Sequence, residues 1–172
     1  MIEFRRILVS ILAAMVLAGC GAGDSFQLTT DPVGTKIVTG RFSPSLLESD
    51  SSFVWYPHEF KSFNPDSSSV APISTHAANL HFIVVGGTWC SDTRRELPRF
   101  FKTLAVAHVD GEKVELYGVD RSKVSQDGLT ERYNINRVPT FIVFLQGQEV
   151  GRIVEFSKPG IDIELANILR EK

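Results

Sequence analysis

Cysteine is nearly absent from this 172-residue sequence, which contains only Cys20 and Cys90. Two cysteines cannot build a structural zinc site by themselves, and the four histidines show no ligand spacing, so we expect no metal and no other cofactor. The net charge is −2, and no basic stripe with interleaved aromatic residues occurs, which excludes nucleic acid as an expected partner. No internal repeat is visible. With 43% hydrophobic residues, the chain is long enough for one domain with a real core.

A hydrophobic run long enough for a comfortable membrane span is also missing. Residues 1–19 instead join Arg5 and Arg6 to the shorter apolar stretch "ILVSILAAMVLAG", which is typical of a secretory signal. The stretch ends in Leu17-Ala18-Gly19-Cys20, which resembles the lipobox of bacterial lipoproteins. That resemblance implies cleavage before Cys20 and acyl chains, including palmitate, on this cysteine, which would hold the protein at a membrane of the cell envelope. The alternative is an ordinary secretory signal with an incidental cysteine.

Lipidation of Cys20 would leave Cys90 as the one free thiol of the mature chain, with no internal disulfide. Residues 20–35 are small and polar without periodicity, which predicts a flexible tether between lipid and domain. We expect residues 36–80 to form an N-terminal extension that packs on a domain of residues 81–172.

Hydrophobic periodicity and turn signals predict alternating strands and helices along the chain. Residues 52–66 concentrate aromatic rings in an otherwise irregular stretch, which we expect to plug one end of the core; a ligand platform is the alternative. The predicted strands are 36–42, 80–87, 113–120 and a hairpin over 140–155, and the predicted helices are 43–50, 66–80, 91–107, 128–135 and 161–170. This order predicts an α/β fold, a mixed β-sheet flanked by helices.

Cys90 stands where the buried strand "LHFIVVGG" passes into a helix. Backbone N–H groups and the helix dipole favour an anion at such a junction, and the thiolate is the nucleophilic form of cysteine. The carboxylate of Asp92 in the first helical turn opposes this effect, and Arg94 and Arg95 partly offset it. The sequence therefore indicates a candidate thiol site without fixing how strongly its thiolate is favoured.

Residues from about 80 to 171 resemble the thioredoxin family. The resemblance is carried by Trp89-Cys90 after the apolar strand, by Pro98 in the following helix, by "GVD" at 118–120 and by "YNINRVPTFIVFLQGQEVG". It implies a thioredoxin-like fold in which Cys90 is the attacking thiol and Trp89 its shielding neighbour. Pro139 would be the cis-proline beside the thiol, and Val138 and Pro139 would form a lip that pairs with an extended peptide.

The sequence departs from the family pattern at three positions. Thr93 replaces the second cysteine, so Cys90 can form a mixed disulfide but cannot release its partner by internal attack. The buried acid of the preceding strand is missing, because its position falls on Val84. Glu155 stands where the family usually has glycine, either as a carboxylate close to the thiol or as an exposed glutamate at the end of a strand.

These features support two functional hypotheses. The first is an envelope-anchored thiol–disulfide oxidoreductase without an internal resolving cysteine, in which the Thr93 hydroxyl assists Cys90 and the partners are protein or low-molecular-weight thiols and disulfides. Such a site suits isomerisation or dethiolation. The alternative is a redox-inactive binding module that holds an envelope partner. A peroxidatic cysteine is a weaker third idea, because in peroxidases the threonine precedes the cysteine. Gly21 carries no inner-membrane retention acid, which by analogy favours an outer membrane if the cell has one.

Overall fold

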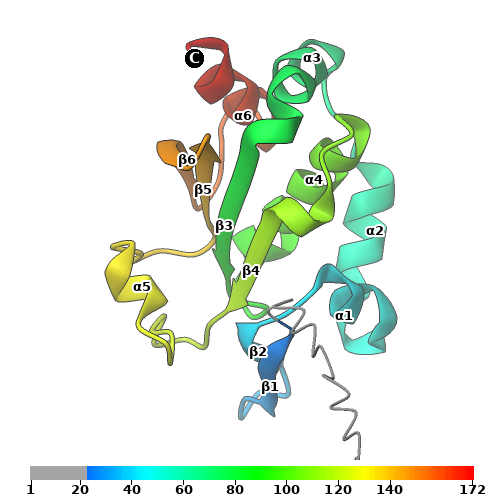
Figure 1. Ribbon diagram of the computed structural model, residues 1–172. Coiled ribbons are helices and arrows are strands. Elements are labelled where there is room, and N and C mark those ends of the chain that lie inside the picture. Colours follow the sequence, from blue (N-terminus) through cyan, green and yellow to red (C-terminus); the bar gives the residue numbers. More distant parts are fainter. Residues whose placement is uncertain (1–22) are drawn as a thin grey trace, which may run out of the picture.

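The structure, a computed structural model, describes residues 23–172, so the predicted signal segment and Cys20 lie outside the described residues. It contains one six-stranded sheet in the order β1-β2-β4-β3-β5-β6 (Figure 1). The strands are β1 Ser25–Thr30, β2 Lys36–Arg41, β3 Leu80–Gly86, β4 Val114–Gly118, β5 Thr140–Leu145 and β6 Gln148–Val154. The helices are α1 Pro44–Ser49, α2 Trp55–Ser62, α3 Ser67–His76, α4 Ser91–Val106, α5 Leu129–Arg132 and α6 Ile161–Arg170, with short 3-10 turns η1 Ser51–Phe53, η2 Ala77–Asn79 and η3 Gly111–Lys113.

The predicted α/β fold with a mixed sheet is confirmed. Strand β3 pairs parallel with β4 and antiparallel with β5, and β5 pairs antiparallel with β6. A β3-α4-β4 unit followed by β5-β6-α6 around a central β3 is the thioredoxin-like arrangement that the sequence predicts. Strands β1 and β2 add an N-terminal extension to this sheet beside β4.

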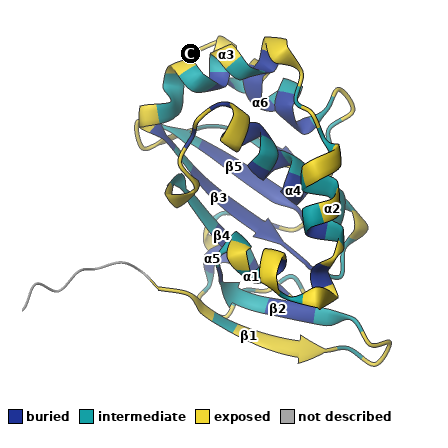
Figure 2. Cartoon of the chain, turned by 90° about the vertical axis from the view of Figure 1, so that its right-hand side faces the viewer, coloured by how far each residue is buried: buried dark blue, intermediate teal, exposed yellow. Residues whose placement is uncertain are grey.

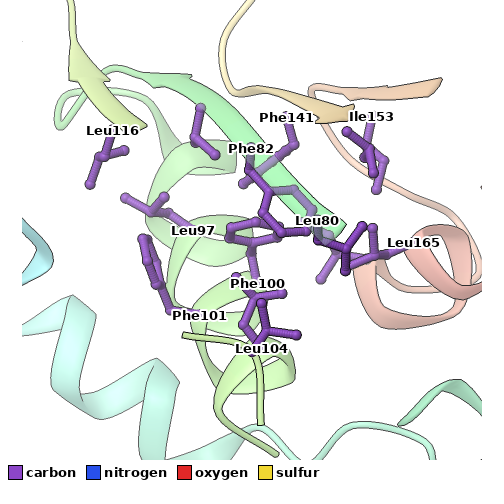
Figure 3. Packing of buried hydrophobic residues seen from close by; sticks show 14 of the residues in the cluster. Leu80, Phe82, Leu97, Phe100, Phe101, Leu104, Leu116, Phe141, Ile153 and Leu165 are labelled. Carbon is purple, nitrogen blue, oxygen red and sulfur yellow. The ribbon is translucent and has the colours of Figure 1, made fainter. Parts of the chain in front are cut away.

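The two faces of the sheet are covered unequally. Alternate residues of a strand point to opposite faces, so Phe82 and Val84 of β3 join one hydrophobic cluster and Ile83 and Val85 join another. The first cluster contains side chains of α1, α2, α3, α4 and α6, and Figure 3 shows Phe100 of α4 packed against Phe82. The second lies under the short α5, which Figure 1 shows on the opposite side of β3 and β4 from α2 and α4. Figure 2 shows the resulting buried centre in β3 and β5.

Most predicted elements occur at their expected places. The run at 80–87 forms β3, whose residues are nearly all buried, and the apolar positions at helical spacing after Cys90 form the inner face of α4. Helix α3 begins after Asp66, whose side chain accepts a hydrogen bond from the Ser68 N–H at 2.8 Å and so caps the helix. The hairpin turns at Gln146 and Gly147, whose φ angles of 52° and 79° match a two-residue turn of the kind that joins tightly paired strands.

The predicted flexible tether of residues 20–35 is wrong for residues 25–30, which form the edge strand β1. Every residue of β1 has a partner in β2, and Figure 2 shows that β1 is nonetheless exposed along most of its length. The turn between the strands begins at Asp31, whose carboxylate accepts hydrogen bonds from the N–H groups of Val33 and Thr35. The Asp-Pro-Val-Gly sequence is the turn signal that marks this hairpin.

The aromatic stretch of residues 52–66, which the sequence predicts to be irregular, instead contributes to η1 and forms helix α2. Phe53, Tyr56 and Phe60 follow one another at spacings of three and four, which place them on one side of a helix. Pro57 lies in the first turn, where the missing N–H costs no helical hydrogen bond. The expectation that these rings plug the core is met by Phe53 and Tyr56, which are 1% exposed.

Candidate functional site

Cys90 occupies the N-cap position of α4, at the end of the loop that leaves β3. Its N–H donates to the carbonyl of Gly87 at 2.8 Å, and its own carbonyl accepts the N–H of Arg94 at 3.0 Å. The side chain is half-buried, and Cys90 is a free thiol. The thiol therefore stands at the N-terminal end of α4, where its side chain makes no capping hydrogen bond to the helix.

Thr93 is buried directly behind this loop. Its hydroxyl oxygen accepts the N–H of Gly87 at 3.2 Å, and the described residues show no hydrogen bond between Thr93 and Cys90. A side chain at Gly86 would place its Cβ 2.8 Å from the Thr93 methyl group. Thr93 thus fills the space behind the loop and fixes its backbone, a structural role that the sequence analysis did not foresee.

The predicted lip lies against the thiol. The Cys90 Sγ donates to the carbonyl of Val138 at 3.4 Å, although the two residues are 48 positions apart, and the Val138–Pro139 peptide bond is cis. The carbonyl of Pro139 accepts the N–H of Glu155 at 2.7 Å. The structure therefore brings Cys90, Val138 and Pro139 together and connects them to the end of β6.

Glu155 has a φ of 64°, in the left-handed region that favours glycine. The carboxylate accepts a hydrogen bond from Arg137 Nη1 at 2.8 Å, and the side chains of Arg137 and Glu155 are 66% and 37% exposed. The structure therefore places Glu155 at the Pro139 side of the site, with its charge paired to Arg137 and with no hydrogen bond to Cys90 among the described residues.

Trp89 is held at one edge and over one face of its indole ring. Its Nε1–H donates to the carbonyl of Val119 at 3.0 Å, and the Arg121 guanidinium lies over the ring at 5.0 Å from the centroid. A side chain at Gly87 would place its Cβ 2.6 Å from the indole. The two glycines before Thr88 thus allow the close approach of Thr93 on one side and of Trp89 on the other.

Charged groups of the first turns of α4 are paired locally. Arg95 donates to Asp92 at 3.1 Å and to Glu96 at 2.7 Å, while Arg94 Nε donates to the carbonyl of Thr88 at 2.7 Å. The side chain of Glu96 is 3% exposed, and this burial raises the pKa of its carboxyl above the ordinary value even though Arg95 lowers it. Of the two arginines expected to offset Asp92, Arg95 pairs with it and with Glu96, whereas Arg94 binds the Thr88 carbonyl.

Sequence reasoning missed Glu96 and Thr88, which are both buried. Glu96 lies between the buried positions Thr93 and Leu97 of the amphipathic α4, so the helical spacing could have predicted that Glu96 is buried too. Thr88 carried no such signal, because its partners are backbone groups of a distant strand. Among residues 23–172, no three His, Cys, Asp or Glu side chains are grouped to hold a metal, and no helix is long and apolar enough to cross a membrane.

Comparison with known proteins shows likeness in structure only. No family model and no curated protein matches the chain. A protein of unknown function from Pseudomonas aeruginosa superposes with a TM-score of 0.53 at 14% identity, over 77% of this chain and 89% of the other. An HIV epitope-scaffold reaches 0.45 at 18% identity, over 67% and 76%, and a mutant thioredoxin from Halobacterium salinarum reaches 0.38 at 20% identity, over 55% and 76%. At these identities, the likeness to the first structure concerns the fold alone.

Proposed function

We propose that Cys90 carries out thiol–disulfide exchange as a single thiol, without an internal resolving cysteine. The observation that carries this proposal is the position of its Sγ, at the N-terminus of α4 and 3.4 Å from the Val138 carbonyl. A thiolate is favoured at a helix N-terminus, and the half-buried thiol remains open to a partner. The thiolate attacks one sulfur of a disulfide, forms a mixed disulfide with it and expels the other sulfur as a thiolate.

The second half of the cycle needs an external thiol. Its thiolate attacks the partner's sulfur in the mixed disulfide, forms a new disulfide with that partner and leaves Cys90 as a thiolate, so the protein undergoes no net oxidation. Thr93 cannot do this, and its oxygen is engaged by the Gly87 N–H. The chemistry therefore suits isomerisation of protein disulfides or removal of a low-molecular-weight thiol from a protein.

The partner's chain would lie along Val138 and Pro139. An extended peptide binds such a lip mainly through backbone hydrogen bonds, which require little side-chain specificity. Trp89 would border this lip beside Cys90, and the Arg137–Glu155 pair would border it beside Pro139. The proposed partners are thus proteins with disulfides, and small thiols or disulfides.

We also propose that the chain is a lipoprotein of the cell envelope. The support is the lipobox-like Leu17-Ala18-Gly19-Cys20 at the end of an apolar leader, with lipid at Cys20 as the membrane anchor. Expression in a bacterial host with labelled palmitate tests this part separately. We expect label in the natural chain and none in the Cys20→Ala variant; label in both variants would contradict the anchor.

The thiol chemistry is tested in the full chain carrying Cys20→Ser, where Cys90 is the only thiol. Treatment with oxidised glutathione is expected to add one glutathionyl group by intact mass, and to add none when Cys90→Ser is introduced as well. Adding Thr93→Cys supplies a resolving thiol three residues away, so the adduct should be released without an external thiol. No adduct in the Cys20→Ser chain, or a rate no faster than that of the unfolded chain, would favour the binding-module alternative.

A further inference from the structure

The loop that carries Cys90 is also held by the N-terminal hairpin β1–β2. Strand β2 pairs with β4 only at Gly40 and Arg41, so its first residues extend beyond the end of β4. In this part of β2, the backbone groups of Lys36 and Val38 form hydrogen bonds with the side chain of Thr88 instead. Its hydroxyl donates to the carbonyl of Lys36 at 2.9 Å, and its oxygen accepts the N–H of Val38 at 3.2 Å.

Thr88 is 2% exposed, so water does not substitute for these hydrogen bonds. The Thr88 hydroxyl thus takes the place of the backbone groups that a neighbouring strand would offer to this part of β2. It stands two residues before Cys90, and its own carbonyl accepts the Arg94 Nε–H at 2.7 Å. Thr88 therefore connects β2 on one side to the first turn of α4 on the other.

The turn of the hairpin makes a second contact with the same loop. Asp31 accepts a hydrogen bond from Arg121 at 2.9 Å, and Arg121 lies over the indole of Trp89. The hydrogen bond from Arg121 and those from the turn N–H groups hold the pKa of Asp31 below its ordinary value. The Asp31 carboxylate is thus charged at neutral pH, and it fixes the cation that covers Trp89.

We infer that the β1–β2 hairpin is part of the thiol site and that Thr88 is a positioning residue for Cys90. This inference rests on the proposed function, because the positioned group is the attacking thiol. Cys90 approaches Val138 only if the loop keeps its place over β3, and small displacements of a reacting group cost large factors in rate. Thr93 holds the loop through the Gly87 N–H, and Thr88 holds it through the Lys36 carbonyl, so the two threonines act through separate hydrogen bonds.

The test compares three variants in the full chain with Cys20→Ser. Thr88→Val keeps the side-chain shape and removes both hydrogen bonds to β2, whereas Thr88→Ser keeps the hydroxyl. Thr103→Val is the matched control, because Thr103 is a fully buried threonine within helix α4 whose hydroxyl donates to the Arg99 carbonyl at 2.8 Å, away from the loop. The rate of mixed-disulfide formation with oxidised glutathione is measured at a temperature where circular dichroism shows all the variants folded.

We expect Thr88→Val to slow adduct formation by about fivefold or more, because the net contribution of even one of its two lost hydrogen bonds corresponds to about that factor. Thr88→Ser and Thr103→Val should stay within about twofold of the parent, because neither removes the link from β2 to the loop. An unchanged rate in Thr88→Val, or an equal loss in Thr103→Val, would overturn the inference.

The two proposals fail in different ways. If the parent forms no adduct, the proposed exchange chemistry is wrong, and the positioning of Cys90 is then measured by alkylation with iodoacetamide, which needs no disulfide. In that measurement Thr88→Val should again change the rate while Thr88→Ser and Thr103→Val do not. Equal alkylation rates in all of these variants would overturn the positioning role by itself.

Discussion

Glu155 offers a direct test of the backbone geometry beside the thiol site. Its φ of 64° costs a residue with a Cβ about 1–2 kcal/mol, whereas glycine adopts this conformation without that cost. Replacing Glu155 by alanine or by glycine removes the ion pair with Arg137 in both cases. The two variants therefore differ only in how they tolerate the left-handed backbone and in the entropy of the unfolded chain.

The expected order follows from these two effects. Glycine loses about 0.5–1 kcal/mol more backbone entropy on folding than alanine, which offsets part of the strain relief. Glu155→Gly should therefore be more stable than Glu155→Ala by about 0.5–1 kcal/mol. The lost ion pair contributes at most about 1 kcal/mol, because the Arg137 and Glu155 side chains are 66% and 37% exposed. Glu155→Gly should then lie close to the natural chain in stability.

Urea unfolding measures this difference as a shift of the midpoint at constant slope, about 0.2–1 M for a domain of this size. Val154, the exposed last residue of β6, gives the matched control. There the backbone is extended, so Val154→Gly should be less stable than Val154→Ala, the reverse of the order at Glu155. If alanine proves as stable as glycine at position 155, the left-handed strain argued from the structure is refuted.

Two further predictions concern groups packed behind the loop. Gly86→Ala should lower the free energy of unfolding by about 1–3 kcal/mol, because its Cβ would lie 2.8 Å from the buried Thr93 methyl group; urea unfolding should show no comparable loss in Gly111→Ala, where a Cβ meets nothing within 4 Å. Burial raises the pKa of Glu96 above its ordinary 4.5, so the native state favours the protonated form and this stability is lost as pH rises through the native pKa. The stability of Glu96→Gln relative to the natural chain should therefore increase from pH 4.5 upward, and a difference independent of pH would contradict this assignment.

The sequence predicted the central part of the fold well because its signals were local and strong. The apolar run of β3 and the helical spacing after Cys90 each define one element, and the segment around Val138-Pro139-Thr140 placed the lip against the thiol. The hairpin β1–β2 was missed because β1 has few buried side chains and exists through its backbone pairing with β2. A strand that is stabilised mainly by its neighbour leaves little hydrophobic pattern in its own sequence.

The same limit applies to the site. Residue types at recognisable spacings were enough to place Cys90, Trp89 and Pro139. The partners of Thr88, by contrast, are an N–H and a carbonyl of β2 that lie 50 and 52 residues away, and nearly every residue possesses such groups. Thr93 illustrates the remaining difficulty, since the sequence suggested a hydroxyl that assists Cys90, whereas the described residues show no hydrogen bond between the two side chains. The structure assigns that side chain the packing against Gly86 and the hydrogen bond from Gly87 that hold the loop in place. A loop without a second cysteine thus still keeps Cys90 at the N-terminus of α4, because Thr93 fixes that loop from behind.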